Sequence, residues 1–411
     1  MMLLYDLIVV GSGAAGMISA ITAARHGKKV LLLEKLSKPG AKLKATGGGR
    51  CNLTNTLPND LFMKHFGRNG RFMRPALSYF DYHALTRFFK DLDVETHAPD
   101  GYRIFPKTHN AQTILSALEK EAARCGVTLL CSQKVDQIIK KEEDFTLHTT
   151  DQTFRSKNVI IATGGLGYPT LGAEGDGYKL AASLGHTVTD LHPAMMPLHT
   201  KERWVANCRA DTIPKATIRV NLPKYKKLYA TGDLIFTKTG IRGPVVLDFS
   251  REITPLLTQY KEVPLLVNMT GGLHEDAILS QLKKSIQKHP DHPLLHHLQT
   301  MLPKSVAREI CTMCDISDQM LFSKIPGKKR DTLLKTLAWT PLTVTGHDGF
   351  RMAMITRGGI SLKEIDPDTM QSKRVAGLYF CGEVVDLDGP CGGYNLQWSF
   401  ASGYLAGHLR D

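Results

Sequence analysis

The chain has 411 residues, of which 42% are hydrophobic and 22% charged, and this composition is typical of a globular protein with two or three domains. No apolar run is long enough to span a membrane, no cationic segment precedes the first apolar run, and the eight cysteines lack regular spacing, which excludes a membrane-spanning or disulfide-framed protein and predicts a cytoplasmic one without a signal peptide. The net charge of +13 favours an anionic partner such as nucleic acid.

The first predicted elements are a strand ending at residue 10, a glycine-rich turn, a helix reaching residue 26 and a second strand over residues 30–33. Gly11 permits a sharp turn, Gly13 lets the backbone approach a pyrophosphate, and Gly16 lets helix and strand pack closely. N–H groups at the helix start favour phosphates, and a following acid can bind a ribose. A glycine-rich turn without a ligand is the alternative. The predicted dinucleotide contacts are Gly11, Gly13, Ala14, Ala15, Gly16, Glu34 and Lys35.

The next informative segment is a loop over residues 46–52, TGGGRCN. Its glycines expose backbone beside a cation and a thiol, so Gly48, Gly49, Arg50 and Asn52 are predicted to lie along a phosphate or a flat ring. No second cysteine stands five residues after Cys51, which argues against dithiol exchange. The single thiol either donates a proton to a substrate or is a small buried residue.

Two segments interleave cations with aromatic residues. Residues 61–75 carry Arg68, Arg71 and Arg74 among phenylalanines, a pattern typical of single-strand nucleic-acid binders, although a surface helix with its phenylalanines in the core is the alternative. Residues 192–268 read as β-rich, and between residues 201 and 251 they hold eleven basic and four acidic residues. A solvated hairpin is the alternative there. The predicted anion contacts in this part are Lys224, Lys226, Lys227, Lys238 and Arg242.

Residues 275–337 have helical spacing and several proline stops, which predicts a small helical subdomain. Cys311 and Cys314 lie in it without a second cysteine pair or suitably spaced histidines, so neither zinc nor dithiol chemistry is supported. The histidines at 289, 292, 296 and 297 fall in a proline-broken stretch and are expected to be solvated. We therefore predict no metal site.

The last part of the chain returns to cofactor binding. Strands ending near residues 161 and 380 are followed by small residues that let the backbone pass beside a cofactor. A loop over residues 388–395 then opens a helix over residues 396–408, whose N-terminus can stabilise the negative charge of a reduced flavin. The cofactor contacts predicted from residue 135 onward are Val135, Ala162, Thr163, Gly164, Gly382, Glu383, Asp386, Gly392, Gly393, Tyr394, Asn395 and Leu396.

These motifs together resemble the YhiN/BaiN-type family of flavoproteins, often called aminoacetone oxidase-like. The loops at 46–52 and 392–395 are its most distinctive matches, and Lys238 and Arg242 depart from its usual pattern. The resemblance implies an α/β fold with a Rossmann-like FAD-binding domain of the glutathione-reductase type, an inserted β-barrel-like domain and a small helical domain. The implied boundaries are 1–191 plus 346–411 for the FAD domain, 192–272 with 338–345 for the barrel, and 273–337 for the helices.

The resemblance also implies reduction of an activated carbon–carbon double bond. NAD(P)H would reduce tightly bound FAD, flavin N5 would deliver hydride to the β-carbon of a conjugated carbonyl, and Cys51 or, second, Cys391 would protonate the α-carbon. The concentrated positive charge favours uridine in ribosomal RNA, or in its precursor particle, as the substrate. The alternatives are a reductase of small steroid-like enones and a non-catalytic flavin-binding assembly protein.

Overall fold

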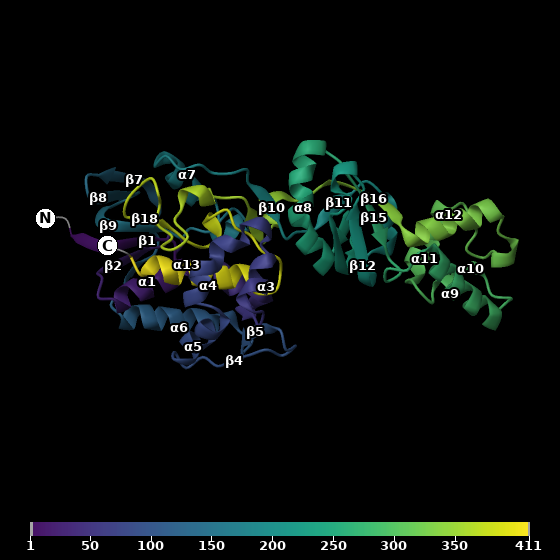
Figure 1. Cartoon of the computed structure of the whole chain (residues 1–411), viewed down its shortest axis with the longest axis horizontal. Helices are drawn as coiled ribbons and strands as arrows, with labels where there is room; N and C mark the ends of the chain where they lie inside the picture. The colour runs from purple at the N-terminus through teal and green to yellow at the C-terminus, as the bar shows by residue number, and fades with distance from the viewer. Residues whose placement is uncertain (1–2, 410–411) are drawn as a thin grey trace. The chain divides into compact units, whose positions relative to one another are not determined.

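The computed structural model describes residues 3–409, which form two compact units, residues 3–193 with 353–409 and residues 194–352 (Figure 1). The first unit is built on a seven-stranded sheet in the order β6-β2-β1-β9-β8-β7, with β18 paired to β9. Strands β6, β2, β1, β9 and β18 pair in parallel, as a Rossmann-like fold requires. The strands are β1 (Leu4–Val10), β2 (Val30–Leu33), β6 (Thr128–Leu130), β7 (Val135–Lys141), β8 (Asp144–Thr149), β9 (Thr153–Ile161) and β18 (Leu378–Phe380).

Helices and two small sheets complete the first unit. Strands β3 (Thr54–Asn55), β5 (Arg103–Pro106) and β4 (Thr96–His97) form one small sheet, and β10 (His192–Ala194) pairs with β17 (Ile355–Arg357) in the other. The helices are α1 (Ala14–Arg25), α2 (Ala41–Ala45), α3 (Asn59–Lys64), α4 (Arg74–Tyr79), α5 (Tyr82–Lys90), α6 (Ala111–Arg124), α7 (Asp176–Ser183) and α13 (Tyr394–Gly407).

Helix α13, drawn in yellow, lies against α1 although the two are far apart in the sequence (Figure 1). Glycines make this approach close. A Cβ on Gly403 would lie 2.3 Å from the Ala15 carbonyl oxygen, and one on Gly407 would lie 2.5 Å from that of Ser19. The first unit therefore needs both ends of the described chain to complete its helical layer.

The second unit contains a closed barrel of six strands in the order β11-β14-β13-β12-β15-β16, which confirms the predicted barrel-like insertion. The strands are β11 (Leu198–Thr200), β12 (Thr212–Val220), β13 (Tyr229–Phe236), β14 (Gly240–Arg242), β15 (Val263–Asn268) and β16 (Thr340–Gly346). The helices are α8 (Pro244–Tyr260), α9 (Glu275–Lys288), α10 (Leu294–Leu298), α11 (Lys304–Met313) and α12 (Gly327–Ala338). Barrel and helices share one hydrophobic core, which includes Val267, Ile278 and Leu333.

Residues 192–268 are β-rich as expected, but they also contain helix α8, which the sequence analysis did not predict. It has 17 residues, and its buried apolar side chains Val245, Phe249, Ile253 and Leu256 recur at the three- and four-residue intervals of one helical face. Pro244 occupies the first turn, where proline is tolerated because its missing N–H has no helical partner. No helix in the described part of the chain is both long and apolar enough to cross a bilayer.

A buried carboxylate joins α1 to α6 in the first unit. Glu121 is 3% exposed, and its Oε1 accepts hydrogen bonds from Arg25 at 2.6 and 2.8 Å while Arg124 donates to both of its oxygens. Hydrogen bonds from Arg124, and then from Arg25, lower the pKa of Glu121 from near 4.5 to about 2 against the opposing effect of burial.

We expect Glu121→Gln to lower the free energy of unfolding by about 1–3 kcal/mol at pH 7, because two charge-assisted partners lose their carboxylate. Since the folded pKa is depressed, the stability from this group is complete above about pH 4.5 and is lost as the pH falls toward 2. Urea unfolding at several pH values measures the difference between the two proteins. A difference that stays constant from pH 7 to pH 3 would contradict the assignment.

Candidate active site

The glycine-rich turn between β1 and α1 leaves open space at one position and none at two others. A Cβ on Gly16 would lie 1.8 Å from the Gly11 carbonyl oxygen, and one on Gly11, whose φ is 101°, would lie 2.7 Å from the Ala162 carbonyl oxygen. A Cβ on Gly13 would meet no atom of the surrounding structure within 4 Å. The turn thus packs tightly against its own unit while keeping room beside Gly13.

The start of α1 is suited to an anion. Gly13 is its N-cap and offers no side-chain cap, and its first turn holds no acidic residue, so the first N–H groups, which include those of Ala14 and Ala15, have neither a side-chain cap nor an intrahelical partner. Glu34, which is 9% exposed, lies beside the turn: its Oε2 accepts hydrogen bonds from the N–H and hydroxyl of Ser12 at 3.0 and 2.6 Å. Because the Leu36 N–H also donates to the Glu34 Oε1 at 2.9 Å, a sugar would bind to oxygens that already accept bonds from the protein, whereas the helix N-terminus is open to an anion.

Other predicted contacts line the same end of the sheet. Ala162 continues β9, and its N–H donates to the Val10 carbonyl at 2.9 Å. The hydroxyl oxygen of Thr163 is buried and has no hydrogen-bond partner, and no neighbour lies within 4 Å of where a Gly164 Cβ would stand. Val135 is buried at the start of β7. The Thr163 hydroxyl faces Gly177 of α7, so the open glycine positions are the feature expected where a ligand completes the structure.

Two predicted cofactor contacts, Lys35 and Glu383, are held by the protein itself. The Lys35 ammonium pairs with Glu174 and Asp176 at 2.7 and 2.6 Å. Both carboxylate oxygens of Glu383 have partners, because Lys42 donates to its Oε2 at 2.7 Å and the Thr356 N–H donates to its Oε1 at 3.0 Å.

Four other predicted contacts at this end of the chain differ from one another in burial and bonding. Burial raises the pKa of Asp386, which is half-buried. The side chain of Asn395 bonds to both the N–H and the carbonyl of Gly389 at 2.7 and 2.8 Å, so it closes its own loop. Gly382 is buried at the end of β18, and Leu396 lies half-buried on α13.

The two most distinctive loops of the sequence, residues 46–52 and 392–395, lie against each other. With its amide oriented to satisfy both neighbours, Asn52 accepts a hydrogen bond from the Gly393 N–H and donates to the Thr54 carbonyl, each at 3.1 Å. Asn55 donates to the Gly392 carbonyl at 2.9 Å. Gly48 and Gly49 adopt positive φ with open space beside them, and Arg50 is exposed. The joined loops therefore present open backbone and a cation.

The structure does not favour Cys51 as a proton donor. Its side chain is fully buried, and burial raises the pKa of its thiol to about 12. Since a donor must reach the substrate, the alternative of a small buried residue fits this position. Cys391 is half-exposed in the loop over residues 388–395 and remains a candidate proton donor.

A pair of tyrosines that the sequence analysis did not bring together lies at the same loops. The hydroxyl oxygens of Tyr102 and Tyr394 are 2.5 Å apart, and Tyr102 is half-exposed whereas Tyr394 is buried. The Tyr394 ring packs against Phe62 and Phe66. Phe62 and Phe66 are themselves buried, so they are core residues, as the alternative for residues 61–75 stated, and they offer no stacking platform.

The predicted anion contacts are all exposed but do not form one patch. Lys224, Lys226 and Lys227 precede β13, whereas Lys238 follows it and Arg242 ends the next strand, β14. Because β13 has eight residues at about 3.3 Å each, the two groups lie roughly 25 Å apart. Arg68, Arg71 and Arg74 are exposed in the first unit, and Arg74 lies 3.6 Å from Asp60.

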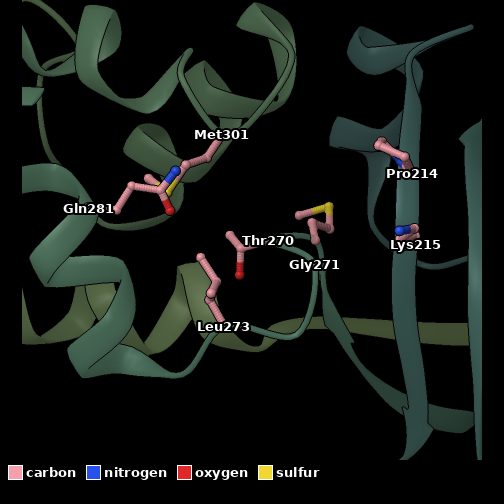
Figure 2. Close-up of a pocket in the computed structure, with 8 residues that line it drawn as sticks. Pro214, Lys215, Thr270, Gly271, Leu273, Gln281 and Met301 are labelled. Carbon is pink, nitrogen blue, oxygen red and sulfur yellow. The ribbon is translucent and has the colours of Figure 1, made fainter.

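The second unit also holds a cavity of about 460 Å³, which lies between β12 and the segment after β15 (Figure 2). None of the predicted contacts lines it. Lys215 is the ionisable residue of its lining, which otherwise consists of Pro214, Met269, Thr270, Gly271, Leu273, Gln281 and Met301.

Comparison with known proteins agrees with this fold. Residues 5–409 match the model of the HI0933-like protein Rossmann domain. The chain is 33% identical to a 3-dehydro-bile acid delta(4,6)-reductase of Clostridium scindens, over 97% of both chains. It is 29% identical to the ribosomal RNA dihydrouridine synthase of Escherichia coli, over 97% of this chain and 96% of that one. A 3-ketosteroid delta1-dehydrogenase of Sterolibacterium denitrificans, 12% identical, has the same fold with a TM-score of 0.52 over 98% and 99% of the two chains.

These relatives are enzymes, which disfavours the non-catalytic alternative. The matched model covers nearly the whole chain, and the sheet, the glycine turn and the barrel agree with the fold that the resemblance implied. The chain belongs to the HI0933-like family of FAD-binding Rossmann proteins and is an oxidoreductase.

Proposed function

We propose that this oxidoreductase reduces a carbon–carbon double bond conjugated to a carbonyl, with NADH or NADPH as the electron source. A delta(4,6)-reductase and a dihydrouridine synthase both carry names that describe the addition of hydrogen across such a bond. The chemistry common to these two relatives is therefore the reaction we assign to this chain, and it needs one hydride and one proton for each double bond reduced.

The FAD that this reaction requires fits the first unit. The open turn at Gly13 and the α1 N-terminus would hold its pyrophosphate, Glu34 its ribose, and the joined loops its ring. When bound, FAD supplies the hydride to the substrate. The open space beside Gly13, Gly48 and Gly49 supports this placement, because a ligand can approach the backbone there.

We assign the proton to the Tyr102–Tyr394 pair, with the Cys391 thiol as the alternative donor. Tyr102 is half-exposed, so its hydroxyl can donate a proton to the substrate carbon and take one back from solvent, while the Tyr394 hydroxyl, 2.5 Å away, hydrogen-bonds the intervening phenolate. The buried side chain of Tyr394 would hold the Tyr102 hydroxyl in position, and Asn55 holds the neighbouring Gly392 carbonyl in place.

For the substrate, the observation with most weight is the spacing of the exposed cations. Lysines 224, 226 and 227 lie roughly 25 Å from Lys238 along β13, and a small neutral molecule cannot contact both groups whereas a polyanion can. Tyr229, next to the first group, is 67% exposed and offers a face for stacking on a base. We therefore propose uridine in ribosomal RNA as the substrate, reduced to dihydrouridine.

The identity to the bile acid reductase favours a second candidate, a reductase of small steroid-like enones. That relative is 33% identical over 97% of both chains, compared with 29% for the RNA-modifying relative. Such an enzyme would not need widely spaced cations, so the two candidates differ in what they predict for the lysines.

The deciding experiment measures dihydrouridine in ribosomal RNA by mass spectrometry, in cells with and without this protein. We expect one dihydrouridine to disappear on deletion and to return with the wild-type gene. Triple replacement of Lys224, Lys226 and Lys227 by alanine should restore it only partly, and should lower the slope of log affinity against log salt by about 2 if each lysine meets a single-stranded phosphate. Unchanged dihydrouridine on deletion would reject RNA as the substrate and favour the enone reductase.

A further inference from the structure

Three of the histidines expected to be solvated are exposed or half-exposed and converge in the second unit, whereas the fourth, His297, is buried. His289 and His292 are exposed and His296 is half-exposed, and one ring nitrogen of each lies within 4.8 Å of those of the other two. Their ring centroids are 5.0 Å apart for His289 and His292, 4.2 Å for His292 and His296, and 5.2 Å for His289 and His296. We propose that these histidines bind a divalent transition metal ion, such as Zn²⁺, through their three imidazole nitrogens.

The backbone that carries the histidines is already held in place. The His292 N–H donates to the His289 carbonyl at 3.2 Å, which forms a turn with Pro290 at its second position, where proline is favoured. Helix α10, which carries His296, buries Leu294 and Leu298 in the core of the second unit. Because both segments are anchored, binding would require only side-chain rotation, at a small cost in conformational entropy.

His297 supports the arrangement without being a ligand. It is 1% exposed, and its two ring nitrogens lie 2.9 Å from the Ser285 hydroxyl and 3.2 Å from the His292 carbonyl oxygen. Both nitrogens are thus engaged, and the second contact holds the turn that presents His292. This contact explains why three of the four neighbouring histidines are available to a metal.

The donor set determines which ions fit. In a tetrahedral zinc site with Zn–N distances of about 2.05 Å, the nitrogens stand about 3.3 Å apart, so the three rings need to move inward by roughly 1.5 Å at most. Water would take the fourth position. Neutral imidazoles suit Zn²⁺, Ni²⁺ and Cu²⁺ and bind Mg²⁺ and Ca²⁺ poorly, because those ions prefer oxygen. A bound ion would join the end of α9 to the start of α10.

The test titrates tag-free protein, purified with its native cofactor content, with zinc chloride in a calorimeter at neutral pH. We expect the wild type to bind one Zn²⁺ per chain. The Zn²⁺ affinity should fall by at least about tenfold in His289→Ala, His292→Ala and His296→Ala. The matched control is His274→Ala, since His274 lies in the same unit at the start of α9 and makes no side-chain cap there. Failure of the wild type to bind Zn²⁺, or equal affinity in all variants, would overturn the proposal.

Cobalt(II) provides a second readout that does not depend on stability. Binding at three imidazoles and water gives visible absorption bands without the strong near-ultraviolet band of a cobalt–thiolate bond. Such a thiolate band would place the metal at one of the free cysteines, such as Cys311 or Cys314 in the same unit, and would reject the histidine site. Circular dichroism of each variant checks that the fold is retained.

Discussion

Alanine at position 13 is expected to leave the protein folded while weakening its affinity for FAD by about tenfold or more, which is ~1.4 kcal/mol. The Gly13 φ of −73° suits any residue, and a Cβ there meets nothing within 4 Å, so the fold should lose at most about 1 kcal/mol through the helix cap. The same methyl group would occupy the space assigned to the pyrophosphate. Titration of the apoprotein with FAD, followed by flavin fluorescence, measures the affinity.

Two further glycine variants make this result specific. Gly16→Ala should lower the melting temperature as well as the FAD affinity, because its Cβ would lie 1.8 Å from the Gly11 carbonyl oxygen and would separate helix from strand. Gly346→Ala, at another open position with ordinary φ, should change neither. Equal FAD affinity in the Gly13 and Gly346 variants would show that the turn does not hold the pyrophosphate.

Replacement of Tyr102 by phenylalanine is expected to slow substrate reduction by about 10²–10⁴-fold, the usual contribution of a general acid, while flavin reduction by NAD(P)H keeps its rate. The change removes one hydroxyl and its bond to Tyr394 but keeps the ring. Stopped-flow measurement of the two half-reactions separates the effects. Tyr79→Phe, at an exposed tyrosine in the same unit, is the control.

The two candidate donors give opposite patterns in this experiment. If Tyr102→Phe reduces the substrate at the wild-type rate and Cys391→Ala does not, the thiol is the donor and the tyrosine assignment is wrong. A slower flavin reduction in Tyr102→Phe would instead indicate that the hydroxyl acts on the reductive step or on the position of the ring.

Local patterns in the sequence predicted the elements that depend on local chemistry. The strand expected over residues 30–33 is β2 and the helix expected to reach residue 26 is α1, and the turn before that helix has the tight packing that Gly11 and Gly16 indicated. Helix α8 was missed because Gly243 and Pro244 punctuate a strand-rich region, although the spacing of Phe249, Ile253 and Leu256 carried the helical period.

The site depends on contacts that no local pattern contains. Tyr102 and Tyr394 are 292 residues apart, and nothing in the short strand around Tyr102 indicates its partner. The burial of Cys51 was likewise not predictable from its neighbours, because the glycines just before it in the sequence are exposed while its thiol is fully enclosed. Tertiary packing, which decides both, is not encoded within any short window.

The packing of α13 on α1 has a consequence for synthesis on the ribosome. Residues 14–25 are made early, but the helix that lies against them spans residues 394–407. The whole of residues 194–352, with its own core, emerges in between and can fold first. The apolar residues of α1 therefore stay uncovered until α13 has been synthesised. We expect the nascent Rossmann sheet to depend on chaperones during this interval.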